Sequence, residues 1–258
     1  MNFPRYPSAI AATLIIPAYN EAQRFLPALE AYTEAFTARY GRHYQLLIVC
    51  NGCRDNTVEL AQAFAARHSQ VQVLVIEAAI GKGGAVLEGF RHATGARVGF
   101  ADADGATAPQ SLLSLYDRLP GHDGVIGSRH LRSSVITNPQ PLTRRAYSWG
   151  FGLLVRGLFQ LPYADTQCGA KVFTQAAARE LAQVVGERRW AFDVDLLLRA
   201  QQRSFDILEA PVVWADKEGS KLKVFSTIRE VAVSLARLKL CGQERPATGV
   251  QGSRTVEA

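Results

Sequence analysis

Two carboxylates separated by one small residue, Asp102-Ala103-Asp104, are the first candidates for chemistry in this sequence. They follow the apolar run 98–101, which is typical of a strand buried on both faces of a parallel sheet. Ligands bind at the carboxyl ends of such strands, where paired acids can hold a divalent cation while ligand phosphates complete its coordination. A turn followed by a helix cap suits the same residues, so this segment alone leaves both interpretations open.

The glycine-rich segment Gly81-Lys82-Gly83-Gly84, ahead of a predicted helix at 85–93, is the second candidate. It lacks the spacing of a Walker motif and the third glycine of the dinucleotide fingerprint. A flexible backbone at a helix N-terminus, with a lysine beside it, can still accept anionic groups. The alternative is a tight turn with a solvated lysine.

The segment 17–21 follows a β-branched apolar run at 13–16 and contains Tyr19 and Glu21. At the end of a strand, this ring and this carboxylate could lie on the same sheet edge as Asp102. Taken by itself, the segment suits an ordinary helix start equally well.

The elements that would position these residues alternate between strand and helix patterns, which predicts an α/β fold with a mostly parallel sheet flanked by helices. Strands are predicted at 13–16, 45–49, 71–76, 98–101, 124–127 and 207–213. Helices are predicted at 21–40, 58–68, 85–93, 109–119, 149–160, 191–203 and 221–240. Asn56 and Glu59 form a capping-box pattern before the second helix, and residues 129–145 read as a loop.

Length and composition favour one large α/β domain, because the chain has 258 residues and is 48% hydrophobic. A net charge of +6 suits nucleic acid, nucleotide phosphates or an anionic membrane about equally.

Residues 1–12 show no secretory signal, and the apolar stretch 149–161 contains Arg156 and is too short to span a bilayer. Cys50 and Cys53 have CxxC spacing, but no second Cys or His pair accompanies them, so we expect reduced thiols.

Three segments in chain order resemble family 2 glycosyltransferases of the GT-A fold, and three later segments resemble the dolichyl-phosphate β-glucosyltransferase branch. The first three are 15–21, 81–85 and 102–107, and the later three are 165–174, 189–197 and 218–222. The related mannose synthases usually carry a glutamine where this chain has Ala106, which favours the glucosyl branch. The resemblance covers about residues 11–240, and the ordered set is far more specific than any one of its pieces.

The resemblance implies an inverting, metal-dependent transfer of a sugar, glucose from UDP-glucose, to a polyprenyl or dolichyl phosphate. Donor contacts fall on Pro17, Tyr19, Glu21, Asn51, Gly81, Lys82, Asp102, Ala103 and Asp104. Asp104 is the principal ligand for Mg2+ or Mn2+, and Asp102 belongs to the metal site by bonding the ribose or an outer-shell water. Asp104 and Arg129 are the catalytic candidates. The acceptor phosphate is assigned to Arg129, Arg144 and Lys221. Its second pKa is about 6, so no strong general base is needed.

Alternatives remain open at this point. One is a GDP-mannose-dependent polyprenyl-phosphate mannosyltransferase, and another is a glycosyltransferase with a soluble hydroxyl acceptor, which would need a general base. A third is a nucleotide-sugar-binding protein without catalysis. Asn51 stands where the family commonly has an aspartate, which leaves the nucleotide preference undecided. Asp165 and Asp193 either touch the sugar or the loops, or are buried acids paired with arginines.

A membrane-bound acceptor requires a route to the bilayer. We expect a catalytic domain at 1–241, in which 221–240 is a candidate interfacial amphipathic helix, and a disordered tail at 242–258. Its apolar stripe, formed by Phe225, Ile228, Ala232, Leu235 and Leu238, could equally pack on the sheet. Together with 149–161, this helix could instead bind a membrane-spanning partner. The resemblance implies a cytoplasmic protein, peripheral at the cytoplasmic membrane face, with no nucleic-acid partner.

Overall fold

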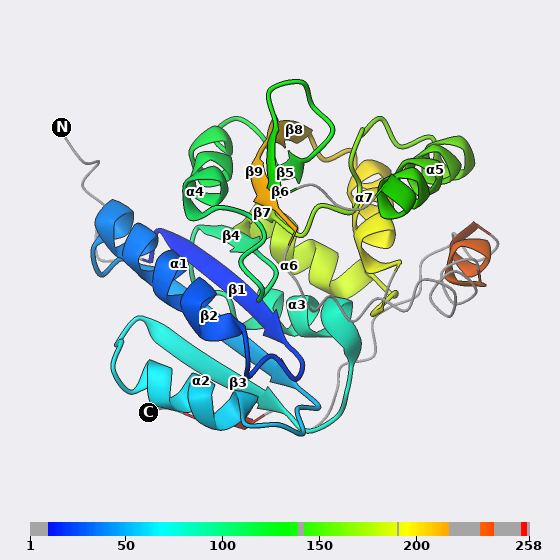
Figure 1. Ribbon diagram of the computed structural model, residues 1–258. Helices are drawn as coiled ribbons and strands as arrows, with labels where there is room; N and C mark the ends of the chain where they lie inside the picture. Colours follow the sequence, from blue (N-terminus) through cyan, green and yellow to red (C-terminus); the bar gives the residue numbers. More distant parts are fainter. Residues whose placement is uncertain (1–9, 139–141, 190, 217–232, 240–253, 257–258) are drawn as a thin grey trace.

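An eight-stranded sheet forms the centre of the molecule (Figure 1). The computed structural model describes residues 10–138, 142–189, 191–216, 233–239 and 254–256. The strands, in spatial order, are β10 (Arg254–Val256), β3 (Val71–Ile76), β2 (Tyr44–Asn51), β1 (Ala12–Ala18), β4 (Arg97–Phe100), β7 (Lys171–Thr174), β5 (Gly124–Ser128) and β8 (Ile207–Pro211). Only β7 and β10 run antiparallel to their neighbours in this sheet. A separate parallel pair consists of β6 (Val135–Asn138) and β9 (Val213–Ala215).

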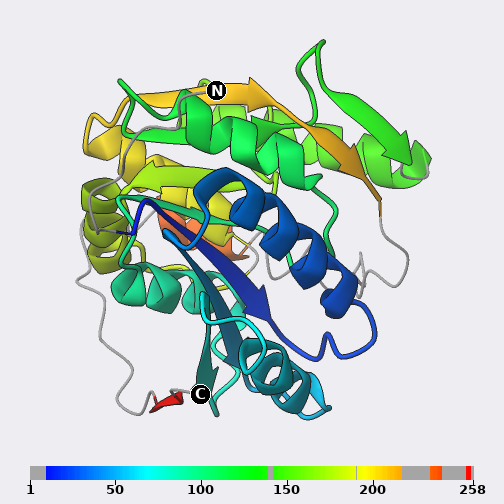
Figure 2. The same cartoon turned by 90° about the vertical axis from the view of Figure 1, so that its left-hand side faces the viewer.

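Helices cover both faces of the sheet, which gives three layers (Figures 1 and 2). The first face packs against α1 (Phe25–Tyr40), α2 (Thr57–Ala65) and α4 (Pro109–Arg118). The second face packs against α3 (Gly81–His92), α6 (Gln175–Val184) and α7 (Phe192–Gln202). The helix α5 (Leu142–Phe159) packs on α7 in a smaller apolar cluster, together with residues of the helical stretch 233–239.

Strand β1 illustrates why these sequences form central strands. All seven of its residues are buried. Leu14 and Ile16 pack in the core of the first face and Ile15 in the core of the second, because successive side chains of a strand point to opposite faces. An apolar run without alternation is therefore the expected pattern for a strand covered by helices on both sides.

The predicted α/β class with a mostly parallel sheet is confirmed. The predicted loop at 129–145 is wrong, because it contains β6 and the beginning of α5, which starts at Leu142 instead of residue 149. Strand β7 and helix α6 were not predicted. β7 has only four residues and begins with a lysine, and α6 has few bulky apolar residues, so neither shows a clear period.

Several predicted boundaries also differ from the structure. Helix α1 begins at Phe25 instead of residue 21. The capping box at Asn56 does not form, and the Asp55 side chain instead accepts a hydrogen bond from the Thr57 amide at 3.1 Å. The predicted strand 207–213 is divided between β8 and β9, in different sheets.

The C-terminal predictions are tested only in part, since 217–232 and 240–253 lie outside the described residues. Within the tail expected to be disordered, 254–256 form β10, because the edge of β3 offers backbone groups to pair with. In the stretch 233–239, Leu235 is 2% exposed and packs with α5 and α7, so this part of the predicted stripe faces the protein. No helix in the described part of the chain is long and apolar enough to cross a bilayer.

Candidate active site

The carboxyl ends of β2, β1 and β4 meet at one edge of the sheet, because these neighbouring strands are parallel. Asn51 ends β2, Tyr19 follows β1 and is 46% exposed, and Asp102 and Asp104 follow β4. Lys82 lies in the first turn of α3 and contacts Asp102. The structure therefore brings these predicted site residues to a common edge.

Each carboxylate of the Asp-x-Asp segment faces one cation. The Lys82 Nζ lies 2.7 Å from Asp102 Oδ1, and the Arg24 Nη1 lies 3.9 Å from Asp104 Oδ2. Burial and the negative charge of Asp102 raise the pKa of the Asp104 carboxyl. Burial opposes the charge of Lys82, but the Asp102 and Asp193 carboxylates outweigh it and raise the pKa of its ammonium.

The two carboxylates fit a divalent cation that is completed by ligand oxygens. Among the residues that the structure describes, no cluster of three or more His, Cys, Asp or Glu side chains could hold a metal ion. Mg2+ is commonly bound through one or two carboxylates plus substrate phosphates, which is the donor set that Asp102 and Asp104 offer. With only these two carboxylates as protein ligands, the other coordination positions of such an ion would be available to oxygens of a bound ligand.

The glycine-rich segment is not the flexible loop that the sequence predicted, because α3 begins at Gly81 itself. A Cβ added to Gly81 would lie 2.5 Å from the Arg188 carbonyl oxygen, and one added to Gly83 would lie 2.5 Å from the Phe192 ring. The Gly84 amide donates to the same Arg188 carbonyl at 3.2 Å. These glycines let α3 approach the segment before α7 closely, and this approach fixes the position of Lys82.

Asn51 carries an unsatisfied buried acceptor. Its side chain is 1% exposed, and its Nδ2 donates to the Ala18 carbonyl at 3.0 Å. Its Oδ1 is buried and has no hydrogen-bond partner within the described residues. Buried acceptors are seldom left unpaired, so this oxygen is available to a donor group on a ligand. The neighbouring Cys50 and Cys53 are free thiols, as predicted.

Pro17 and Glu21 lie beside this edge in different settings. Pro17 is buried within β1. The Glu21 carboxylate is paired with Arg24 through both the Nε and the Nη2 of the guanidinium, and the Glu21 amide donates to Thr57. The Arg24 Nη1 is buried without a hydrogen-bond partner among the described residues. Glu21 therefore orients Arg24 so that its third nitrogen faces Asp104.

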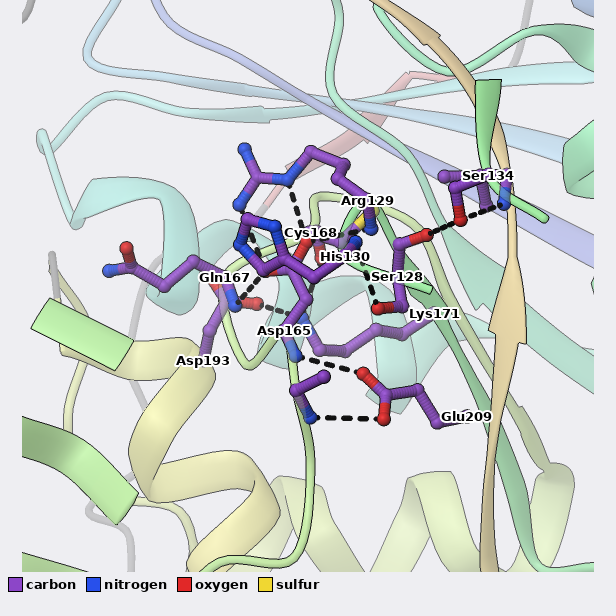
Figure 3. Close-up of polar contacts among 12 residues, drawn as sticks. Ser128, Arg129, His130, Ser134, Asp165, Gln167, Cys168, Lys171, Asp193 and Glu209 are labelled. Carbon is purple, nitrogen blue, oxygen red and sulfur yellow. Dashed lines mark hydrogen bonds and ion pairs between the residues drawn. The ribbon is translucent and has the colours of Figure 1, made fainter. Parts of the chain in front are cut away.

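Arg129, at the end of β5, is bound to a buried carboxylate (Figure 3). Its Nε and Nη2 donate to Asp165 at 2.7 and 2.9 Å, and its guanidinium carbon lies 5.4 Å from the Trp214 ring centre. The Glu209 carboxylate accepts from the Asp165 amide at 2.8 Å. Burial opposes ionisation of Asp165, but Arg129 outweighs it and lowers the pKa of that carboxyl. Asp165 is thus a buried acid paired with an arginine, in agreement with one of the two interpretations.

The side chains of the other two residues predicted to bind the acceptor phosphate, Arg144 and Lys221, lie outside the described residues. Arg144 belongs to α5, whereas Lys221 lies outside the described residues altogether. The sequence also assigned no role to Arg24, Gly169 or Lys171, which the structure brings to the edge.

Strand β7 explains how Gly169 and Lys171 reach the site. Because it runs antiparallel between β4 and β5, its first residue starts at the edge where those strands end. Lys171 pairs in register with Phe100, and its ammonium contacts Asp193 at 2.6 Å. The hydrophobic periodicity of the sequence does not predict the contact between Lys171 and Asp193, because the order of the strands brings these two residues together.

Comparisons with known proteins agree on one family. The model of glycosyl transferase family 2 matches residues 13–182. A dolichyl-phosphate beta-glucosyltransferase of Trichomonas vaginalis is 34% identical over 91% of this chain and 72% of its own length. The enzyme of that name from Homo sapiens is 31% identical, over 88% and 74% respectively. Among solved structures, a mannosyltransferase of Pyrobaculum calidifontis in complex with GDP-Man and Mn2+ has a TM-score of 0.63 at 18% identity, over 95% of this chain and 67% of its own.

Proposed function

The chain belongs to glycosyl transferase family 2 and is a glycosyltransferase with the GT-A fold, and from that premise we propose that it transfers glucose from UDP-glucose to a dolichyl or polyprenyl phosphate. The observation that carries the proposal is the sheet edge at which Asp102 and Asp104 each face a cation. The names of the relatives support the lipid phosphate as acceptor and glucose as the sugar.

The donor diphosphate is assigned to this edge because it gains negative charge as it leaves. The cations available to it are the ammonium of Lys82 and the Nη1 of Arg24, which has no hydrogen-bond partner among the described residues. The free Oδ1 of Asn51 can accept a hydrogen bond from a ring N–H of the base. Uracil and guanine both offer such a donor, so this contact alone does not select between UDP and GDP.

Asp104, with Asp102, would hold the Mg2+ or Mn2+ ion. When bound, the cation supplies charge stabilisation for the departing diphosphate. Lys82, whose ammonium lies 2.7 Å from the Asp102 carboxylate, would donate to a phosphate oxygen of the same donor.

The acceptor phosphate is assigned to Arg129. Two of its nitrogens are held by Asp165, which leaves Nη1 to donate to a phosphate oxygen. The phosphate is already largely ionised at neutral pH, so the enzyme has to orient it for attack on the anomeric carbon with inversion. Arg144 and Lys221 stay further candidates for this contact.

A dolichyl chain lies in a membrane, and we assign this protein a peripheral place at its cytoplasmic face. The helix α5 exposes Leu153 and Leu154, which are 44% and 50% exposed, and Val233 is exposed in the adjoining helical stretch. Exposed apolar side chains together with a net charge of +6 suit contact with an anionic bilayer or with a membrane-spanning partner.

The proposal is tested by incubating the purified protein with UDP-glucose or GDP-mannose, Mg2+ or Mn2+, and anionic vesicles that carry a polyprenyl phosphate. We expect glucolipid from UDP-glucose, with the protein co-sedimenting with the vesicles. A mannolipid from GDP-mannose would favour the mannosyltransferase instead. Transfer only to soluble hydroxyl acceptors would refute the lipid-phosphate acceptor, and nucleotide-sugar binding without any transfer would indicate a non-catalytic protein.

Gly169→Ala should slow transfer by about 10-fold or more, since the added Cβ would lie 1.8 Å from Asp102 Oδ2 and must displace this carboxylate. Thermal unfolding and initial rates at saturating donor check this result. Gly150→Ala is the matched control, because a Cβ at Gly150 meets nothing within 4 Å, and its rate should stay normal. A normal rate for Gly169→Ala would show that Asp102 need not keep its position.

A further inference from the structure

A fully buried lysine lies directly behind the site. Lys171 is 0% exposed and begins the interior strand β7, where it pairs in register with Phe100 on β4 and Ile126 on β5. Its ammonium donates to the Cys168 carbonyl at 2.7 Å and to Asp193 Oδ1 at 2.6 Å (Figure 3). The stability of a sheet does not require an ion pair there, because apolar residues of similar volume often serve as well or better.

The second oxygen of Asp193 is directed to the active-site edge. Asp193 Oδ2 lies 3.8 Å from the Lys82 Nζ, which itself lies 2.7 Å from Asp102. Both ammonium groups also lie near the Phe100 ring, with Lys171 at 5.6 Å and Lys82 at 5.9 Å from its centre. Lys171, Asp193, Lys82 and Asp102 therefore form a chain of alternating charge that runs from the core to the site.

We propose that the buried pair Lys171–Asp193 is a positioning device for Lys82, in which Asp193 supplies a fixed counter-charge that keeps the Lys82 ammonium at the diphosphate-binding edge. Lys171 holds Asp193 in place through one oxygen, so the other oxygen stays turned toward Lys82. When Lys82 leaves Asp102 for a phosphate, Asp193 remains beside it. This role rests on the proposed function, in which Lys82 binds the donor diphosphate.

The position of Asp193 is set independently of the site. It lies in the first turn of α7, where a carboxylate is favoured by the helix dipole, and it is 8% exposed. Phe192, its neighbour, packs against Gly83 of α3, so α3 and α7 are in direct contact at this point. This contact sets the distance between the backbones that carry Asp193 and Lys82.

The test measures binding of UDP and GDP by calorimetry, with EDTA and with Mg2+, to the full chain and its variants. The decisive variant is Lys171→Met/Asp193→Asn, which removes both charges of the buried pair together, so that no single buried charge remains without its partner. We expect it to unfold near the wild-type temperature, to bind the preferred nucleotide about 10-fold more weakly, and to raise the donor KM more than it lowers kcat. Lys82→Met should weaken binding by at least the same factor.

Arg199→Met is the control, because it breaks another buried ion pair of α7, with Asp195, that does not contact Lys82. It should lower stability and leave nucleotide affinity unchanged. Wild-type affinity in the double variant, with weaker binding in Lys82→Met, would overturn the positioning role and leave the proposed function intact. Unchanged affinity in Lys82→Met would overturn both this role and the assignment of the diphosphate to Lys82.

Discussion

Replacing Asp104 with asparagine should reduce sugar transfer by about 100- to 1,000-fold, which is the range seen when a group that stabilises transition-state charge is removed. Asparagine keeps the shape of the side chain and the oxygen that accepts from the Ala106 amide at 3.0 Å. It removes the charge that would hold the metal. Initial rates with UDP-glucose and a polyprenyl phosphate, measured across a Mg2+ and Mn2+ titration, check this result.

The same substitution should not destabilise the fold. Burial and Asp102 raise the pKa of the Asp104 carboxyl, so its charge is unfavourable in the protein without a metal. We expect the unfolding temperature to stay constant or rise slightly, as is common where a site is kept for function at the expense of stability. Asp117→Asn is the control, since the Asp117 side chain is 46% exposed and its carboxylate pairs with Arg39. Normal turnover of Asp104→Asn at every metal concentration would remove Asp104 from the metal site.

Replacing Asp165 with asparagine should lower the free energy of unfolding by about 3 kcal/mol, because it leaves the Arg129 guanidinium, whose side chain is only 15% exposed, without its carboxylate partner. Asp165 is 3% exposed and accepts three hydrogen bonds from Arg129 alone, counting the backbone amide. Urea unfolding at pH 7 measures the loss. A difference below about 1 kcal/mol would mean that water or another group replaces the pair.

The pH dependence of stability gives a second readout for Asp165. Its pKa is lowered in the folded protein, so between that value and the ordinary carboxyl pKa of about 3.9 the unfolded chain binds more protons. The stabilisation is complete above the unfolded pKa and is lost as the pH falls toward the folded one. Below about pH 4, wild-type stability should therefore fall more steeply than that of Asp165→Asn. If the stability of both proteins fell equally steeply with pH, the lowered pKa of Asp165 would be contradicted.

A double variant can test the proposed binding of the acceptor phosphate by Arg129 separately from the contribution of Arg129 to stability. The double variant Arg129→Met/Asp165→Leu replaces the buried pair by apolar groups and should recover most of the lost stability. We expect it to stay inactive with a polyprenyl phosphate, because the guanidinium that would bind the acceptor is gone. Full activity in this variant would assign Arg129 to the fold alone.

Much of the architecture follows from local patterns in the sequence. Apolar runs such as 13–16 and 45–49 predicted strands covered on both faces, and the helices between them predicted parallel pairing. Since parallel strands end at one edge, these patterns are enough to place Asn51 and Asp102 on the same side of the sheet. Their joint position needs only the order and direction of the strands.

The sequence by itself thus determined the class of fold, the edge that carries the Asp-x-Asp segment and, through the ordered motifs, the family. Only the tertiary structure decided how the charges of that edge are held. The antiparallel strand β7 brings Gly169 against Asp102 and Lys171 behind Lys82, and the turn before α1 directs Arg24 to Asp104. The physical reason is that burial repeats along the chain with a local period, whereas an ion pair depends on which distant segments become neighbours.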